Sequence, residues 1–228
     1  MTSTRDTEGR ALYRLMTWLS PSYPVGAYTY SHGLEYAVEA GWVTDRASTQ
    51  GWVGDIVSHG GGFSDAVLLA AAYEAGGNEL SEVAELALAF APTAELALES
   101  KMQGNAFLEM TSKAWPQAGL ERLISVWGGP YPYPVVVGVA ARGAGIALLQ
   151  VLEAYLHAFA ANLVSAAVRL IPLGQTDGQL IMAALESVVA AAALEAVATP
   201  PDDLATTAFM ADVASMKHET QYTRLFRS

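Results

Sequence analysis

Apolar residues recur at intervals of three and four positions along most of the chain, the spacing that gathers them on one face of a helix. The first such face is formed by Ala11, Leu12, Leu15, Met16 and Leu19. Pro21 then stops the helix, because proline lacks the backbone N–H that a helix interior requires. The same pattern predicts about ten helices, at residues 7–19, 32–40, 44–58, 65–75, 79–91, 93–115, 135–149, 150–170, 176–198 and 202–216.

Proline and glycine interrupt this pattern at four places, in the stretches "SPSYPVGAYTYS", "HGGGFSD", "GGPYPYP" and "ATPPDDL". Each stretch is predicted to be a loop that separates two helices. Polar residues beside the loops are the expected helix starts: Ser31 for the second helix, Thr44 or Asp45 for the third, and Asp202 or Asp203 for the last.

No stretch alternates apolar and polar residues over a useful length, and the best strand candidate is Val135 to Val139. We therefore predict an all-α fold, a single compact bundle of about ten helices that spans residues 1–228 as one domain. A chain of this length can bury a substantial core without disulfides or metals.

The composition indicates that the protein binds a partner. Apolar residues make up 52% of the chain and charged residues only 15%, so more apolar surface is present than one domain normally buries. The net charge of −11 disfavours nucleic acid and anionic membranes as targets, since phosphate groups would be repelled. A basic protein partner fits this balance better.

The chain contains no cysteine, and its first residues lack the apolar core of a secretory signal. Two long apolar stretches carry charges near their middle: Arg142 in the first, and Glu186 and Glu195 in the second. A charge at mid-bilayer costs about 2.5–3.5 kcal/mol, so we expect buried helices of a soluble, cytoplasmic protein, without membrane insertion.

The last residues, "MKHETQYTRLFRS", differ from the rest of the chain. Lys217, Arg224 and Arg227 oppose only Glu219, so a formal charge of +2 ends an acidic protein. Large apolar side chains lie among these cations, and such mixtures dominate protein-binding hot spots. We predict that residues 217–228 form a tail that becomes ordered when it binds a partner.

Catalytic and metal-binding patterns are weak. The four histidines, His32, His59, His157 and His218, are too far apart in sequence for a two-histidine metal face. The glycine-rich runs lack the lysine of a phosphate-binding loop, and no G-x-S-x-G nucleophile motif occurs. His157, in an apolar helix, is expected to be a core residue. These patterns argue against an enzyme.

Two charged residues lie in apolar surroundings, Glu35 and Arg169. In the simpler interpretation Glu35 is a solvated residue on a helix face, and Arg169 caps carbonyl groups at a helix C-terminus. In the functional interpretation both act at an interface with a partner. The residue types alone favour the simpler interpretation.

Four blocks of the sequence resemble a known family. They are "LSPSYPVGAYTYSHGLEYAVEAGWV", "ESKMQGNAFL", "NLVSAAVRLIPLGQTDGQ" and "MKHETQYTRLFRS", and they are similar, in this order, to the signature blocks of the urease accessory protein UreF family. The resemblance extends from Leu19 to Ser228 and is looser between the blocks.

The resemblance implies a non-catalytic chaperone of urease maturation, an all-α homodimer. Such an adaptor binds the accessory protein UreD, also called UreH, and recruits the GTPase UreG for GTP-dependent nickel insertion into apo-urease. The protein is expected to bind no cofactor firmly itself, with nickel handled by the complex. Whether nickel passes through this subunit stays open.

The resemblance also assigns residues to two surfaces. The surface for UreD/UreH would comprise Lys217, His218, Glu219, Gln221, Tyr222, Arg224, Leu225, Phe226 and Arg227. The surface for the GTPase or for the second subunit would comprise Pro24, Gly26, Tyr28, Tyr30, Glu35, Arg169 and Gln175. Whether Arg169 enters the nucleotide site, and whether it activates or restrains the GTPase, stays open.

An α-helical enzyme with a buried apolar pocket, acting on a prenyl-like substrate, is the alternative. Such an enzyme needs an aspartate-rich site for metal and diphosphate. The chain offers only the adjacent pair Asp202 and Asp203, which is better explained as a helix start.

Overall fold

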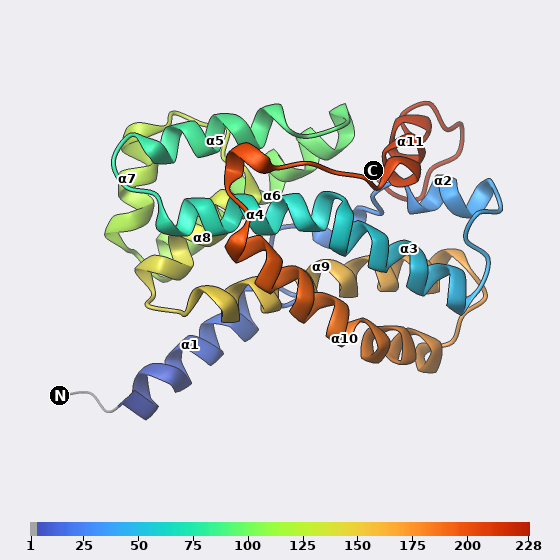
Figure 1. Cartoon of the computed structure of the whole chain (residues 1–228), viewed down its shortest axis with the longest axis horizontal. Coiled ribbons are helices and arrows are strands. Elements are labelled where there is room, and N and C mark those ends of the chain that lie inside the picture. The colour runs from blue at the N-terminus through green and yellow to red at the C-terminus, as the bar shows by residue number, and fades with distance from the viewer. Residues whose placement is uncertain (1–3) are drawn as a thin grey trace.

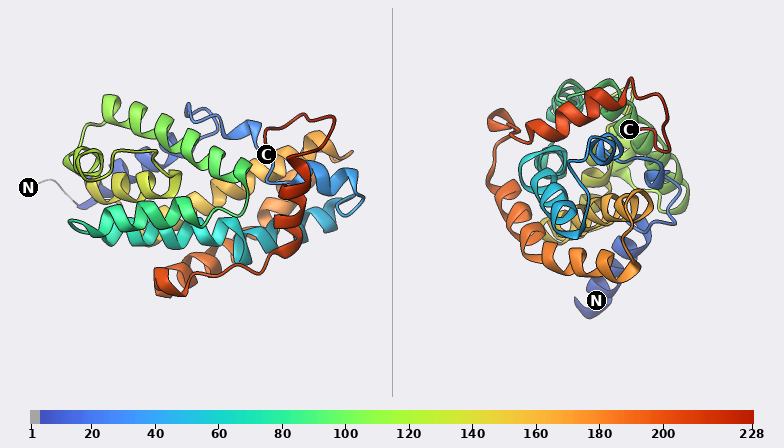
Figure 2. Two further views of the ribbon diagram at one scale, coloured as in Figure 1. Left: turned by 90° about the horizontal axis from the view of Figure 1, so that it is seen from above. Right: turned by 90° about the vertical axis from the view of Figure 1, so that its right-hand side faces the viewer.

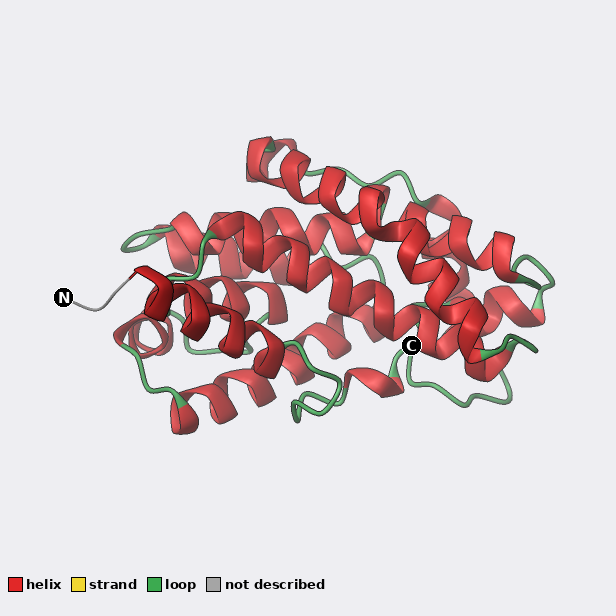
Figure 3. Ribbon diagram, turned by 90° about the horizontal axis from the view of Figure 1, so that it is seen from below, coloured by secondary structure: helices red, strands yellow, loops and turns green. Residues whose placement is uncertain are grey.

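The computed structural model describes residues 4–228, which contain eleven α-helices and two short 3-10 helices (Figure 1). The α-helices are α1 (Thr4–Trp18), α2 (Leu34–Glu39), α3 (Arg46–His59), α4 (Gly61–Glu74), α5 (Glu79–Ala89), α6 (Ala94–Ala114), α7 (Ala118–Val126), α8 (Tyr133–Gly143), α9 (Leu148–Leu170), α10 (Gln175–Ala198) and α11 (Phe209–His218). The 3-10 helices are η1 (Ala27–Thr29) and η2 (Pro201–Asp203). These residues contain no strand (Figure 3), so the all-α prediction is confirmed.

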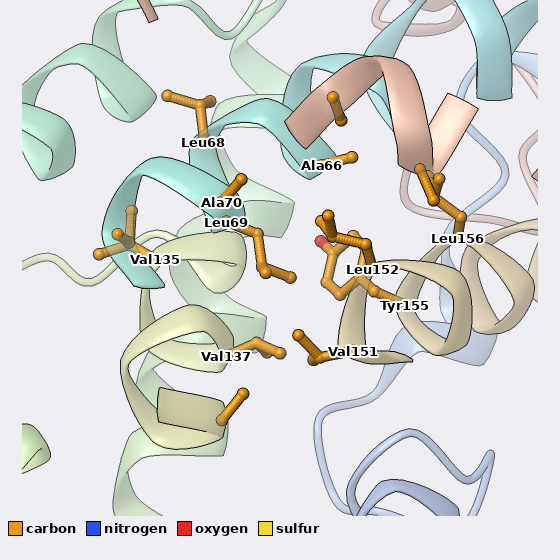
Figure 4. Close-up of a cluster of buried hydrophobic side chains, with 14 of the residues drawn as sticks. Ala66, Leu68, Leu69, Ala70, Val135, Val137, Val151, Leu152, Tyr155 and Leu156 are labelled. Carbon is orange, nitrogen blue, oxygen red and sulfur yellow. The ribbon is translucent and has the colours of Figure 1, made fainter. Parts of the chain in front are cut away.

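The core lies between α4, α8 and α9 (Figure 4). Leu69 of α4, Val137 of α8 and Val151 of α9 point toward this core, and none is more than 1% exposed. The valine run of α8 had the best strand pattern in the sequence, yet it is helical. Burial on nearly every side outweighs the weak intrinsic preference of valine for strands.

The remaining helices surround this centre and lengthen the molecule. α10 packs against α9 and α3, while α6 packs against α8. The N-terminal end of α1 projects from one end of the molecule, and α2 and α11 lie toward the other end (Figures 1 and 2). Trp18 anchors α1, because its ring meets those of Phe107 and Trp115 edge-on at 5.9 Å between centroids.

The predicted break in "HGGGFSD" is one residue wide in the structure, and α4 begins at Gly61, not at Asp65. Gly60 has the extended backbone that turns the chain. A Cβ on Gly62 would lie 3.0 Å from the Cα of Val57, so glycine permits α3 and α4 to meet closely. These glycines allow close packing at the start of α4. The glycine-rich sequence alone indicated only a break between helices.

Two further boundaries differ from the prediction. α7 was missed, because it is short and flanked by irregular segments. The apolar run predicted as one helix to residue 149 ends at Gly143, and a turn with Gly145 at φ 68° leads into α9. Periodicity could not show this turn, since apolar residues continue through it.

The last helix begins later than predicted. Asp202 and Asp203 lie in η2, and the chain then runs extended until α11 begins at Phe209. The carbonyl of His59 holds this stretch, since it accepts hydrogen bonds from the backbone N–H groups of Thr207 and Ala208. Because of this long-range contact, α11 begins later in the sequence than predicted.

By length and composition α9 and α10 could each cross a membrane, with mean hydropathies of 1.4 and 2.0. Length and composition alone are a weak indication of a span. Half of the apolar window of α9 and a third of that of α10 are buried inside the protein, where the two helices pack against each other. Both helices thus contribute to the core.

Candidate functional site

The C-terminal segment, residues 219–228, folds back onto the protein beside α2 and α9. The carbonyl of Ser228 accepts a hydrogen bond of 2.7 Å from the backbone N–H of Ser31 and another from the Ser31 hydroxyl. Ser31 is therefore not the predicted N-cap; Gly33 precedes α2 instead. Next to Ser228, the backbone N–H of Arg227 donates to the carbonyl of Thr29 at 2.8 Å.

Glu35 of α2 is the centre of this contact. Its two carboxylate oxygens accept hydrogen bonds from the backbone N–H groups of Leu225 and Phe226, at 2.7 and 2.9 Å. The residue is only 8% exposed. The simpler expectation of a solvated glutamate was therefore wrong, because a segment 190 residues away in sequence covers it.

A second carboxylate, Glu95 in the first turn of α6, binds the imidazole of His218 and the guanidinium of Arg224. One oxygen lies 2.7 Å from Nδ1 of His218, and the other accepts from Nη1 of Arg224 at 2.6 Å. Nε2 of the fully buried His218 faces Glu35 at 3.3 Å. An imidazolium ring at this position would donate to both carboxylates at once.

A third carboxylate, Glu99, lies one helical turn further along α6. It accepts from the hydroxyl of Ser228 at 2.8 Å and from the amide of Gln103 at 2.8 Å, and it pairs with Nε2 of His32 at 3.0 Å. Burial by itself lowers the pKa of His32. The charge of Glu99 and the hydrogen bond to it outweigh burial and raise the pKa of His32 above its ordinary value.

Glu35, Glu95 and Glu99 together form what we call the acidic seat. The C-terminal segment gives each of these carboxylates a partner. Glu35 receives two backbone N–H groups, Glu95 the guanidinium of Arg224, and Glu99 the hydroxyl of Ser228, as buried carboxylates require. The segment's inward residue is Phe226, which is 4% exposed and lies under the guanidinium of Arg169, 4.4 Å from its ring centroid.

Arg169 joins the C-terminal segment to the first loop. Its Nη2 donates to the carbonyl of Tyr28 at 3.0 Å, and its Nε donates to the carbonyl of Ser165 at 3.2 Å. The second bond is the carbonyl capping expected in the simpler interpretation. Tyr28 is 63% exposed beside it, whereas Tyr30 is buried and its carbonyl accepts from Asn162.

The structure therefore separates the predicted site residues into two groups. Buried in the contact are Tyr30, Glu35, His218 and Phe226. Exposed are Pro24, Tyr28, Arg169, Gln175, Lys217, Glu219, Tyr222, Arg224, Leu225 and Arg227, while Gly26 and Gln221 are half-buried. Glu219 accepts from the backbone N–H of Ala94, and Gln221 donates to Glu39. Gln175, at the start of α10, has no hydrogen bond to the described residues of this group.

Sequence reasoning missed the partners of the C-terminal segment, namely Ser31, Glu95 and Glu99, and the pairing of His32 with Glu99. The one available signal was the pair Glu95 and Glu99, which lie four residues apart and so share a helix face. Nothing in the sequence placed this face opposite residues more than 120 positions away. His157, expected in the core, is exposed on α9.

The site is therefore one that holds a peptide segment by charge and by backbone hydrogen bonds. No group of three or more His, Cys, Asp or Glu side chains that could hold a metal ion occurs among the residues that the structure describes. The fold and the site define an all-helical protein whose own C-terminal segment is docked on α2 and α6.

Comparison with known proteins identifies the family. The UreF family model matches residues 43–186, and the chain belongs to this family. It is 53% identical over 222 residues to the urease accessory protein UreF of Rhodopseudomonas palustris (strain BisA53), covering 96% of this chain and 93% of the relative. It is 50% identical over 225 residues to that of Bradyrhizobium diazoefficiens, covering 97% and 93%.

These matches confirm the resemblance drawn from the four sequence blocks. The protein is a urease accessory protein with a role in urease maturation, and it is not itself an enzyme. The alternative of a helical prenyl-type enzyme is set aside, since Asp202 and Asp203 lie in η2 and do not line the apolar cavity beside Trp18, Phe90 and Tyr155.

Proposed function

We propose that the protein is a cytoplasmic adaptor that binds UreD/UreH through its C-terminal segment and recruits the GTPase UreG. The assembled complex then inserts nickel into apo-urease in a GTP-dependent step. The observation that carries this proposal is the outward face of the seated C-terminal segment, because it offers the side chains of a binding hot spot on an otherwise acidic protein.

The last four residues of the segment, 225–228, alternate between exposed and buried side chains. Phe226 and Ser228 point into the seat, whereas Tyr222 is fully exposed and Leu225 is 66% exposed. Arg227 is also exposed. Exposed tyrosine, leucine and arginine side chains on a fixed backbone favour protein binding, because ordering the backbone in advance lowers the entropy cost of association.

The outer face of α11 continues this surface along the chain. Phe209, Val213 and Met216 recur at helical spacing and are exposed, together with Met210. An apolar helix face of this kind suits a hydrophobic groove in a partner. We therefore place the UreD/UreH contact on α11 and the C-terminal segment together.

We place the GTPase contact at Tyr28 and Arg169, on the edge of the same seat. The Nη1 atom of Arg169 makes no hydrogen bond with a described residue, so it can pair with a carboxylate of a partner. Tyr30 and Glu35 are buried and would act indirectly, by holding the loop and the C-terminal segment in place. A homodimer would present two copies of this arrangement.

The test is co-purification with UreD/UreH. Tyr222→Ala and Leu225→Ala should each weaken the complex by about tenfold or more without lowering the melting temperature, because both side chains are exposed. Thr223→Ala is the matched control, since Thr223 is an exposed polar residue of the same segment. If both apolar variants bound as well as the control, the proposed surface would be wrong.

The GTPase contact is tested in the same preparation by adding UreG with GTP and nickel. Arg169→Ala should retain UreD/UreH but lose UreG and urease activation. Size-exclusion chromatography measures both complexes and also reports whether the free protein is a dimer. Unchanged ternary assembly, GTP turnover and urease activation in this variant would refute the assignment of Arg169.

A further inference from the structure

A cavity of about 270 Å³ lies between the first loop, α4, α6 and α9. Aromatic and aliphatic side chains form much of its wall: Trp18, Leu68, Phe90, Tyr133, Tyr155 and Phe159. It reaches the surface beside the exposed ring of Tyr28. An apolar cavity of this size with a few polar groups at one place has the usual form of a small-ligand site.

Asp65 of α4 is the polar group that distinguishes this cavity. Its Oδ2 accepts a hydrogen bond of 2.7 Å from the hydroxyl of Tyr155. Its Oδ1 has no hydrogen-bond partner among the described residues, and no cationic side chain pairs with it. Burial raises the pKa of Asp65 to about 6, and the Tyr155 hydrogen bond and the charge of His32 oppose this rise. At pH 8, two units above this pKa, the carboxyl group is ionised.

Two of the other charged groups in the cavity pair with each other. His32 and Glu99 form a pair at 3.0 Å, and the oxygens of Glu99 also bind Gln103 and Ser228. The hydroxyl of Tyr133 makes no hydrogen bond with a described residue, and burial together with the charge of Asp65 raises its pKa. Asp65 and Asp212 are the lining carboxylates that form no ion pair with a described residue, and Asp65 is the one beside Tyr155.

The backbone at His32 shows that this arrangement is costly to maintain. His32 has φ 52°, in the left-handed region that residues with a side chain seldom adopt. This conformation holds the imidazole against Glu99 and edge-on to Phe159, at 4.7 Å between ring centroids. The histidine thereby pairs with Glu99 and leaves Asp65 without an ion pair.

These groups do not suit a metal ion. A divalent ion needs several ligands, and the described residues contain no set of three or more acidic, histidine or cysteine side chains that could supply them. A single carboxylate oxygen surrounded by aromatic rings suits a monovalent organic cation instead, since ammonium groups bind both to carboxylates and to the faces of aromatic rings.

We propose that this cavity binds a small organic ammonium ion with an apolar or aromatic body, its ammonium group on Oδ1 of Asp65 and near the rings of Tyr133, Tyr155 and Phe159. This inference goes beyond the adaptor function and does not depend on it. Glu99 contacts both the cavity and Ser228, so the ligand site adjoins the seated C-terminal segment.

The test uses three probes of nearly equal shape, the phenethylammonium cation, neutral 2-phenylethanol and the phenylacetate anion. Binding to the purified full chain is measured by calorimetry at about pH 8, where Asp65 is ionised. The cation should bind at least about tenfold more tightly than the alcohol, and the anion should not compete. Equal binding of the cation and the alcohol, or no binding of the cation, would overturn the proposal.

Variants then locate the site. Asp65→Asn should weaken binding of the phenethylammonium cation by about tenfold or more while the protein remains folded. Asp212→Asn is the matched control, because Asp212 also lines the cavity but takes no part in the Asp65 group, and it should bind the cation normally. Equal loss in both variants, or displacement of the cation by Ni²⁺, would contradict an ammonium site at Asp65.

Discussion

The three glutamates of the acidic seat all bind the C-terminal region, but each binds a different kind of group. Glu35 binds backbone N–H groups, Glu95 binds cationic side chains, and Glu99 binds a hydroxyl, an amide and an imidazole. Each carboxylate is covered and each is satisfied, as a buried charge must be. Removing one partner of a buried charge lowers stability by far more than the pair itself contributes. The loss of any one of these contacts would therefore leave a buried carboxylate without a partner it needs.

Asp65 supplies a prediction for single residues. Its folded pKa of about 6 lies above its ordinary value of 3.8, so the folded protein binds the Asp65 proton more tightly than the unfolded chain does. The Asp65 carboxyl therefore makes its full contribution to the free energy of unfolding below about pH 4. This contribution is lost as pH rises through 6. Asp65→Asn should therefore be about 1–3 kcal/mol more stable than the native protein at pH 8, with little difference at pH 4.

Urea unfolding of both proteins across this pH range measures the difference. Asp45 provides a control of opposite sign, because hydrogen bonds from Ser48 lower the pKa of this exposed N-cap carboxyl. Asp45→Asn should lose stability at pH 8 and approach the native protein in acid. A native stability curve with no dependence on Asp65 would show that its carboxyl is solvated.

Between elements, the start of α2 approaches α11 closely. A Cβ on Gly33 would lie 2.4 Å from the backbone nitrogen of Ser215 and 2.7 Å from the carbonyl carbon of Ala214. Backbone atoms cannot yield as a flexible side chain can. Gly33 therefore sets the position of α11, and with it that of His218 and the C-terminal segment.

Gly33→Ala should move α11 off α2 and destabilise the protein by at least about 2 kcal/mol. Gly41→Ala separates this effect from backbone strain, because Gly41 has nearly the same positive φ, 75° against 73°, but open space around it. Thermal unfolding of the two variants provides the measurement. Equal losses would mean that conformation alone requires glycine at residue 33.

Most helices could be predicted from the sequence, and the failures have physical reasons. Periodic apolar residues located α3, α6 and α10 to within a residue or two, and Asp45 was recognised as a cap. The starts of α4 and α11 were misplaced, because glycine packing fixes the first and a hydrogen bond to His59 fixes the second. Such long-range contacts leave no periodic signal.

The site was predictable only on the side of the C-terminal segment. Its composition identified Tyr222, Leu225 and Arg227 as residues for binding a partner, and the structure leaves all three exposed. Composition could not show that Phe226 turns inward, or that Glu95 and Glu99 receive the segment. These partners are far apart in sequence, and only the packing of α2 and α6 brings them together.

For the whole molecule, we predict that deleting residues 220–228 preserves the helices but lowers stability. The main core lies between α4, α8 and α9 and does not involve the deleted residues. The loss should be at least about 3 kcal/mol, since burial of Phe226 disappears and Glu35 loses its two backbone donors.

Far-ultraviolet circular dichroism and thermal melting of this deletion test both statements. Phe226→Ala should reproduce part of the stability loss with the rest of the segment in place. The deleted protein should also fail to co-purify with UreD/UreH. Loss of the helical signal at low temperature would instead make the C-terminal segment a part of the folding core.

The distance in sequence between Ser31 and Ser228, 197 positions, has a consequence for synthesis. At about 5–20 residues per second, the ribosome adds residues 225–228 roughly 10 to 40 s after Glu35. During this interval Glu35 lacks the backbone N–H groups of Leu225 and Phe226, and Glu99 lacks the hydroxyl of Ser228. A proteolysed chain without residues 225–228 would stay in that condition. The acidic seat therefore differs between chains that carry these residues and chains that have lost them.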